Sequence, residues 1–299
     1  MDTQSWRDKW VKGAKYFDFQ GHQIAYWTGG KETAKPLLLV HGFPTCAFDW
    51  APMWETLGAN HRLIACDMLG FGLSDKPKGG FGDSKNPKGY AIHWQTDIQA
   101  ALLDRLAIRN FDALVHDYGV SVGQEMLARQ QGGFGFEELD QCLFLNGGIF
   151  PDQHRPVTMQ KIGVSPFGFV LGALMNRKGF GKSFSEVFGQ STKPSEAELD
   201  AFWEFISHKG GNRITHKLLH YIADRRTHKV RWESALMAAQ DKIGLINGAL
   251  DPVSGKHAYD KWREVLPDAR HHLLPDVGHY PQVEAPERVA AKVLEWLGD

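Results

Sequence analysis

Short apolar runs that alternate with helical stretches are the feature that most constrains the fold of this chain. Each run is five or six residues long, is bounded by turn signals and is rich in apolar residues, as in strands buried on both faces of a parallel sheet. The expected strands are 36–40, 62–66, 111–116, 141–146, 242–247 and 270–275, and the expected helices are 49–57, 91–108, 121–129 and 286–297. The pattern predicts a doubly wound α/β fold with right-handed crossovers.

Two regions depart from this rhythm. Near the start, 15–20 and 22–27 alternate in polarity around the turn residue Gly21, which predicts a β-hairpin. After Gly148 the strand pattern stops, and until about Met237 the sequence indicates helices and loops only. The expected organisation is therefore an α/β core in two parts with a helical cap inserted between them: 1–148, 149–237 and 238–299.

Composition limits the kinds of partner that this chain is expected to bind. The 299 residues include 34 Lys and Arg and 35 Asp and Glu, interspersed to a net charge of −1, so neither nucleic acid nor an anionic membrane is an expected partner. Three cysteines lack the spacing of a zinc site or a disulfide framework, and a reducing cytoplasm is expected. No secretion signal or spanning segment is indicated, so stable membrane insertion is not expected. The apolar stretch 164–175 could lie in a membrane interface, but a helix over an apolar pocket explains it better.

Residues of catalytic type follow four of the predicted strands, where ligands of parallel sheets bind. They are His41 in HGFP, Asp117 in HDYG, Asp251 in GALDPV and His279 in VGHYP. Each alone has an ordinary structural explanation. Together they repeat the chain order nucleophile, acid, histidine that is found with a nucleophile on a strand-to-helix turn. We therefore expect Asp117 to be the nucleophile, His279 the base and Asp251 the acid that orients it.

A serine alternative lies four residues further on, because residues 119–123 match the G-x-S-x-G elbow of serine hydrolases. With Ser121 at the turn, Asp117 would lie inside a central strand as a buried carboxylate without an evident partner. With Asp117 at the turn, Ser121 and Gly123 become small residues of a helix packed on the sheet. We favour Asp117, although Val115 stands two positions before it, where a small residue is usual.

An aspartate nucleophile restricts the chemistry. It needs no base to activate it, and the helix N-terminus behind it keeps it ionised. Attack on an sp³ carbon gives an alkyl ester, which water activated by His279 can hydrolyse, so the target is an epoxide or a carbon–halogen bond. A departing halide needs N–H donors, commonly an indole next to the nucleophile and an amide or indole side chain in the HGxP turn. In this sequence those two positions hold Tyr118 and Phe43. Their backbone N–H groups are expected to form the oxyanion hole and their side chains to contact substrate.

An opening epoxide forms a basic alkoxide and needs an acidic O–H, such as that of tyrosine. Tyr221 shares the helical spacing of Ile214 and Leu218, so we expect it on the apolar face that packs toward the core, where it would bind substrate and donate this proton. An ordinary interface tyrosine is the alternative. His216 and His220 lie one turn apart without a carboxylate, so no metal is expected there, and the mechanism requires no cofactor.

Several motifs resemble the epoxide hydrolase and haloalkane dehalogenase branch of the α/β-hydrolase family: HGFP, DMLGFGLSDKP (67–77), HDYG and the contexts of Asp251 and His279. Most of the chain is similar to the mesoderm-specific transcript proteins through NGGIFPDQHRP (146–156), VFGQSTKPSEAEL (187–199), LLHYIADRR (218–226) and GALDPV (248–253). The resemblance implies that Tyr221 is the cap tyrosine that precedes the acid by about thirty residues. The second cap tyrosine of epoxide hydrolases has no match, because Tyr221 is the only tyrosine from 119 to 258.

The expected function is therefore that of an epoxide hydrolase acting on a small apolar epoxide. A haloalkane dehalogenase with the same nucleophile and a serine esterase that uses Ser121 are alternatives. A non-catalytic binding protein is disfavoured because nucleophile, acid and base are all present. The oligomeric state does not follow from the sequence.

Overall fold

The centre of the protein is an eight-stranded sheet. The computed structural model describes residues 3–77, 89–156, 158–165 and 168–298. The strands are β1 Lys15–Phe19, β2 His22–Gly30, β3 Pro36–Val40, β4 Arg62–Cys66, β5 Phe111–Val115, β6 Leu139–Phe144, β7 Ile243–Gly248 and β8 Arg270–Leu274. They lie in the order β1-β2-β4-β3-β5-β6-β7-β8. The β1–β2 and β2–β4 pairs are antiparallel and all others are parallel, which confirms the predicted doubly wound, mostly parallel sheet.

Side chains of the central strands alternate between two buried layers, one on each face of the sheet. In β3, Leu38 and Val40 pack in one layer and Leu37 and Leu39 in the other. Residues of α3 Ile92–Arg105, α4 Tyr118–Gly132 and α12 Lys256–Val265 complete the first layer. Residues of α2 Trp54–Gly58 and α14 Pro286–Leu297 complete the second. Every central strand is thus buried on both sides, as its apolar sequence predicts.

Two of the predicted helices differ in type or in bounds from the observed ones. The stretch expected as one helix over 49–57 is a 3-10 helix, η1 Ala47–Met53, followed by the short α2. Pro52 lies inside η1, where it provides no backbone N–H for an α-helical hydrogen bond. The helix expected from Ser121 begins at Tyr118 instead, directly after the turn at Asp117. Two further short helices are α13 Pro281–Glu284 and η4 Gln240–Lys242.

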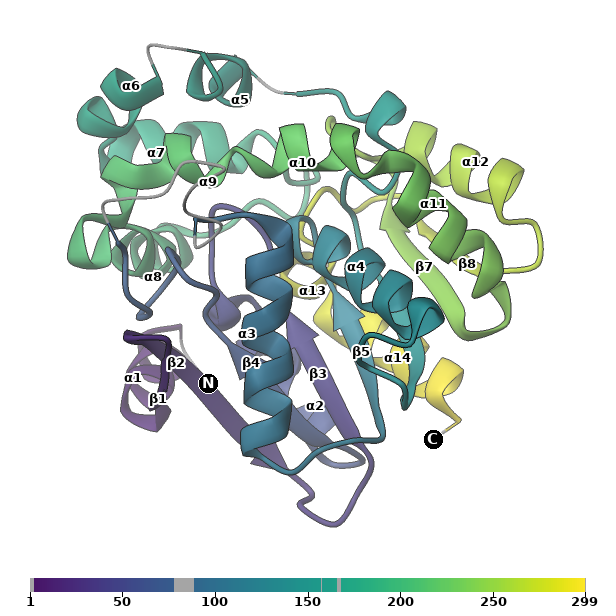
Figure 1. Ribbon diagram of the computed structural model, residues 1–299. Coiled ribbons are helices and arrows are strands. Elements are labelled where there is room, and N and C mark those ends of the chain that lie inside the picture. The colour runs from purple at the N-terminus through teal and green to yellow at the C-terminus, as the bar shows by residue number, and fades with distance from the viewer. Residues whose placement is uncertain (1–2, 78–88, 157, 166–167, 299) are drawn as a thin grey trace.

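Between β6 and η4 the described residues contain no strand, and their regular elements are helices. These are η2 Pro151–Gln153, α5 Thr158–Gly163, α6 Gly168–Leu174, α7 Arg177–Ser185, α8 Glu196–Ser207, η3 His208–Ile214, α9 Thr215–Leu218, α10 Tyr221–Thr227 and α11 Lys229–Ala238. We call this stretch the helical segment. Figure 1 shows α5 to α10 lying across the edge of the sheet at which β5 and β7 end. Helix α11 lies alongside α4.

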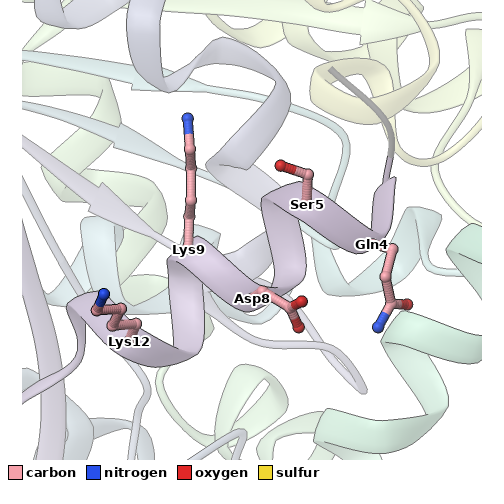
Figure 2. A pocket seen from close by; sticks show the side chains of 5 residues that line it. All are labelled: Gln4, Ser5, Asp8, Lys9 and Lys12. Atoms are coloured by element: carbon pink, nitrogen blue, oxygen red, sulfur yellow. The ribbon is translucent and has the colours of Figure 1, made fainter.

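An N-terminal helix, α1 Thr3–Gly13, was not expected from the sequence. Trp10 anchors it: the ring stacks on Trp27 with centroids 4.9 Å apart, and the Trp27 indole N–H donates to the Trp10 carbonyl at 2.7 Å. The opposite face of α1 is polar, and Figure 2 shows it lining a surface hollow with Gln4, Ser5, Asp8, Lys9 and Lys12. Within the described ranges, none of the helices combines the length and the apolar content needed to cross a bilayer.

Candidate active site

Asp117 occupies a sharp turn between β5 and α4. Its backbone angles, φ 43° and ψ −100°, are strained for a residue with a side chain. Neighbouring glycines make the turn possible, because a Cβ on Gly119 would lie 2.4 Å from the Val40 carbonyl oxygen and one on Gly147 would lie 2.9 Å from the Asp117 Cα. The surrounding backbone therefore packs too closely for side chains at these positions, and it holds the Asp117 carboxylate at the start of a helix.

The two carboxylate oxygens of Asp117 have different surroundings. Oδ2 accepts a hydrogen bond from the backbone N–H of Phe43 at 3.1 Å. Oδ1 is buried and accepts no hydrogen bond from the described residues. It lies 3.8 Å from Nε2 of His279 and 3.9 Å from Nη2 of Arg225. One oxygen is thus held in place while the other is free to react.

His279 lies in the loop after β8 and contacts the acid that follows β7. Its Nδ1 donates to Oδ2 of Asp251 at 2.7 Å, which leaves Nε2 facing Asp117. Asp251 is itself held by the Ser254 hydroxyl at 2.6 Å and by the Asn146 side-chain amide at 3.0 Å. The structure therefore brings Asp117, Asp251 and His279 together from the ends of three strands.

The charges of this group shift the pKa values of its members. Burial alone would raise the pKa of Asp251, but the charge and hydrogen bond of His279 lower it to about 2. Burial disfavours the His279 imidazolium, but the charge and hydrogen bond of Asp251, together with the charge of Asp117, raise its pKa to about 9. His279 is thus protonated at neutral pH.

Several contacts fix the loop that carries His279. Its backbone N–H donates to the Val187 carbonyl of the helical segment at 2.9 Å, and its own carbonyl accepts from His116 Nε2 at 2.8 Å. The Glu284 carboxylate accepts from the backbone N–H groups of Gly278 at 2.8 Å and Tyr280 at 2.9 Å. Both the core and the helical segment therefore position this histidine.

Ser121, the alternative nucleophile, lies in the first turn of α4, and its buried hydroxyl accepts from Nε of Arg225 at 2.7 Å. Its polar contact is with an arginine rather than with the triad histidine. The packing also explains Val115, which stands where a small residue is usual. Its methyl groups lie 3.1 and 3.2 Å from the point that a Cβ of Gly123 would occupy, so the glycine makes room for the valine.

Tyr221 is fully buried and contacts both predicted oxyanion-hole residues. Its ring centroid lies 5.0 Å from that of Tyr118, edge to face, and 6.0 Å from that of Phe43. The Gln160 side-chain amide donates to its hydroxyl at 3.2 Å. Burial and the charge of Asp117 raise the pKa of Tyr221 above the ordinary value for tyrosine. The helical spacing of Ile214, Leu218 and Tyr221 predicted one helix through all three residues, which is wrong. The stretch is divided among η3, α9 and α10, and α10 begins at Tyr221. Ile214 and Leu218 are nevertheless buried, as expected.

Two residues at the site were missed by the sequence analysis. Arg225 is 2% exposed: its Nη2 donates to the Asp117 carbonyl at 2.6 Å, and its guanidinium carbon lies 4.4 Å from the centre of the Tyr221 ring. His154, just after η2, is close enough for the charges of Arg225 and Asp117 to act on its ring. The spacing of four residues between Tyr221 and Arg225 on one helix was a usable signal. His154 had none beyond its place in the motif 146–156.

A metal site would need several ligating side chains close together. No group of three His, Cys, Asp or Glu side chains suited to a metal ion occurs in the parts of the chain that the structure covers. The expectation that no carboxylate accompanies His216 and His220 is wrong, because Nδ1 of His220 lies 3.4 Å from Oδ1 of Asp224, four residues along the chain, in an ion pair.

Comparisons with known proteins agree with this architecture. The model of the Alpha/beta hydrolase family matches residues 37–292. The Mesoderm-specific transcript homolog protein of Homo sapiens is 39% identical over 290 residues, covering 93% of this chain and 83% of that protein. The Cis-3-alkyl-4-alkyloxetan-2-one decarboxylase of Shewanella oneidensis is 28% identical over 292 residues, covering 93% and 86%.

Among solved structures, haloalkane dehalogenase DbeA from Bradyrhizobium elkani superimposes with a TM-score of 0.78 at 21% identity, covering 95% of this chain and 97% of that one. That identity supports the fold alone. The resemblance inferred from the motifs is confirmed by the family model and by the mesoderm-specific transcript proteins. The matched length, the sheet order and the curated relatives lead to one conclusion: this chain belongs to the alpha/beta hydrolase family.

Proposed function

We propose that this protein is an epoxide hydrolase that works through a covalent ester on Asp117. The observation that carries the proposal is the asymmetry of this carboxylate. Oδ2 is held by the Phe43 N–H at 3.1 Å, while Oδ1 is free of hydrogen bonds from the described residues and lies 3.8 Å from His279 Nε2. A nucleophile with one restrained and one free oxygen, next to a histidine that can later activate water, suits a two-step hydrolysis.

In the first step, Asp117 Oδ1 attacks a ring carbon and the ring C–O bond breaks. The ring oxygen takes the proton of the Tyr221 hydroxyl, so the products are a hydroxyalkyl ester and a phenolate. Burial makes Tyr221 a weaker acid than usual, but an opening alkoxide is a far stronger base than a phenolate. The Gln160 amide, which already donates to the Tyr221 oxygen, and the guanidinium of Arg225 over the ring both stabilise the phenolate.

In the second step, His279 takes a proton from water, and the resulting hydroxide adds to the ester carbonyl. The backbone N–H groups of Phe43 and Tyr118 stabilise the oxyanion, the diol leaves and Asp117 is regenerated. Ester formation removes the charge of Asp117, one of the groups that hold the pKa of His279 at about 9. Alkylation therefore favours release of the His279 proton, which the Tyr221 phenolate takes up through solvent, so His279 becomes the neutral base that hydrolysis needs and Tyr221 is restored. Residues 149–237 act in this scheme as a cap that supplies Tyr221.

The experiment that tests the proposal is His279→Gln with styrene oxide as probe. The variant should still form the ester but not hydrolyse it, because only the second step needs the base. Fragment-ion mass spectrometry should then locate one substrate mass on Asp117 itself, because no Lys or Arg lies between Asp117 and Ser121 for trypsin to separate them. An adduct on Ser121 would favour the serine esterase, and absence of an adduct with every epoxide tested would contradict the proposal.

A second candidate substrate is a four-membered lactone. The Shewanella relative is named for such a compound, and Arg225 places a buried cation 3.9 Å from Asp117. If Asp117 attacks the sp³ carbon that bears the ring oxygen, the leaving group is a carboxylate, which needs a cation rather than a proton. The carboxylate can then depart as CO₂, its electron pair forming an alkene as Asp117 is released. No water is consumed, so His279→Gln should turn over a lactone while it accumulates the ester of an epoxide.

A further inference from the structure

One nitrogen of Arg225 has no role in holding the fold. The guanidinium uses Nε to bind Ser121 and Nη2 to bind the Asp117 carbonyl, and both bonds tie the helical segment to the nucleophile turn. Nη1 is buried and donates to no atom of the described residues. Leaving two N–H groups of a buried cation unpaired is costly, so a purely structural role for Arg225 accounts for only two of its three nitrogens.

His154 lies beside this nitrogen. Both of its ring nitrogens are buried and are likewise without a hydrogen bond in the described structure. Burial and the positive charge of Arg225 lower the pKa of His154 to about 4, so at neutral pH the ring is uncharged and offers one N–H. Gly148 allows both groups to approach the backbone closely, because a Cβ there would lie 2.3 Å from Nη1 of Arg225 and 3.1 Å from Nδ1 of His154.

The charges change during the proposed reaction. In the resting site, two carboxylates, Asp117 and Asp251, face two cations, His279 and Arg225. Asp251 forms an ion pair with His279. Among the described residues, Asp117 is the one acidic side chain within 4.0 Å of the Arg225 guanidinium. Once Asp117 is an ester and the Tyr221 phenolate has taken up a proton again, Arg225 is left as a buried cation without a counterion among the described residues. A second anion at Nη1 would restore the balance.

We propose that Arg225 and His154 form a subsite for a carboxylate of the substrate. The donors are the two Nη1 hydrogens of Arg225 and one imidazole N–H of His154, next to the reactive oxygen of Asp117. The carboxylate has two sources: an epoxide that already carries it beside the ring, or a lactone that releases it on ring opening. This proposal rests on the proposed function only for where the reacting carbon lies, because binding of a carboxylate at the subsite can be measured without turnover.

The binding test compares propanoate with propanamide, which has nearly the same shape but no charge, by calorimetry at neutral pH. Charge-assisted hydrogen bonds should make propanoate bind about 10- to 100-fold more tightly than propanamide. Arg225→Gln and His154→Phe should each reduce this preference. Arg288→Gln is the matched control, because Arg288 pairs with Asp276 at the surface and should leave the preference unchanged.

Equal binding of the two probes, or no binding of either, would overturn the subsite, as would a preference that survives in both variants. Because Arg225 also holds the nucleophile turn, circular dichroism should verify that Arg225→Gln is folded. If it is not, His154→Phe decides the question, since the side chain of His154 makes no hydrogen bond to the described residues.

Turnover then distinguishes the two sources. A higher kcat/KM for glycidate than for glycidamide places the carboxylate on the epoxide, and turnover of β-butyrolactone without that preference identifies it as the leaving group. A charge preference in binding with no turnover of any epoxide would support the subsite and contradict the epoxide hydrolase. Turnover of neutral epoxides without any charge preference would do the reverse.

Discussion

The two halves of the site are built in different ways. The sheet contributes Asp117, Asp251 and His279 from strand ends, and hydrogen bonds from several elements hold the acid and the base. The helical segment contributes Tyr221, Arg225 and His154 from short helices and the turn after one, with buried polar atoms left unpaired in the last two. This contrast suggests that the sheet carries the chemistry common to the family and the helical segment sets the substrate. The predictions below test that division, in order of decreasing effect.

The largest effect is expected for Asp117→Ala. Without the nucleophile no ester can form, so turnover of any epoxide should fall by about 10⁴-fold or more. Ser121→Ala is the matched variant on the same helix. It removes one hydrogen bond to Arg225 and should keep activity within about tenfold, corresponding to the net contribution of one charge-assisted bond. Steady-state assays of both variants suffice, and the opposite pattern would identify a serine esterase.

Tyr221→Phe tests the part assigned to the helical segment. It removes one O–H and keeps the ring that packs on Tyr118 and Phe43, so the fold should be retained. Epoxide opening should slow by about 10²- to 10⁴-fold, the usual contribution of a general acid. Single-turnover tryptophan quenching should locate the loss in ester formation. A bromoalkane, whose halide needs no proton, is the control substrate and should lose nothing. An epoxide rate within about threefold of the parent would assign Tyr221 to packing alone.

The pH dependence of ester hydrolysis tests the sheet half. The base must be neutral, so the rate should rise with pH as His279 loses its proton and then level off. In the resting protein the pKa of His279 is about 9, and loss of the Asp117 charge in the ester lowers it, so the inflection should lie below pH 9. Asp251→Asn removes the charge that does most to raise this pKa and should move the inflection to lower pH. A hydrolysis rate that falls as pH rises would exclude His279 as the base.

The sheet was predictable from local patterns. The strands expected at 36–40 and 62–66 and the helix at 286–297 have the observed bounds, because apolar runs that are buried on both faces record their environment residue by residue. Helix α1 was missed although Trp6 and Trp10 lie one turn apart, since its stability comes from stacking on Trp27 in another element. Local sequence therefore predicts an element best when burial of its own residues defines it.

The same limit applies to the site. Asp117, Asp251 and His279 could be predicted as a group, because each follows a strand and all parallel strands end at one edge of the sheet. The neighbours of Asp117 from the helical segment could not. Arg225 reaches the Asp117 carbonyl, 108 positions away, only because the chain folds back over that edge, and the same fold brings Arg225 and His154 together beside Gly148. Strand periodicity carries information about one element at a time, whereas an unpaired buried donor has meaning only among its neighbours in space.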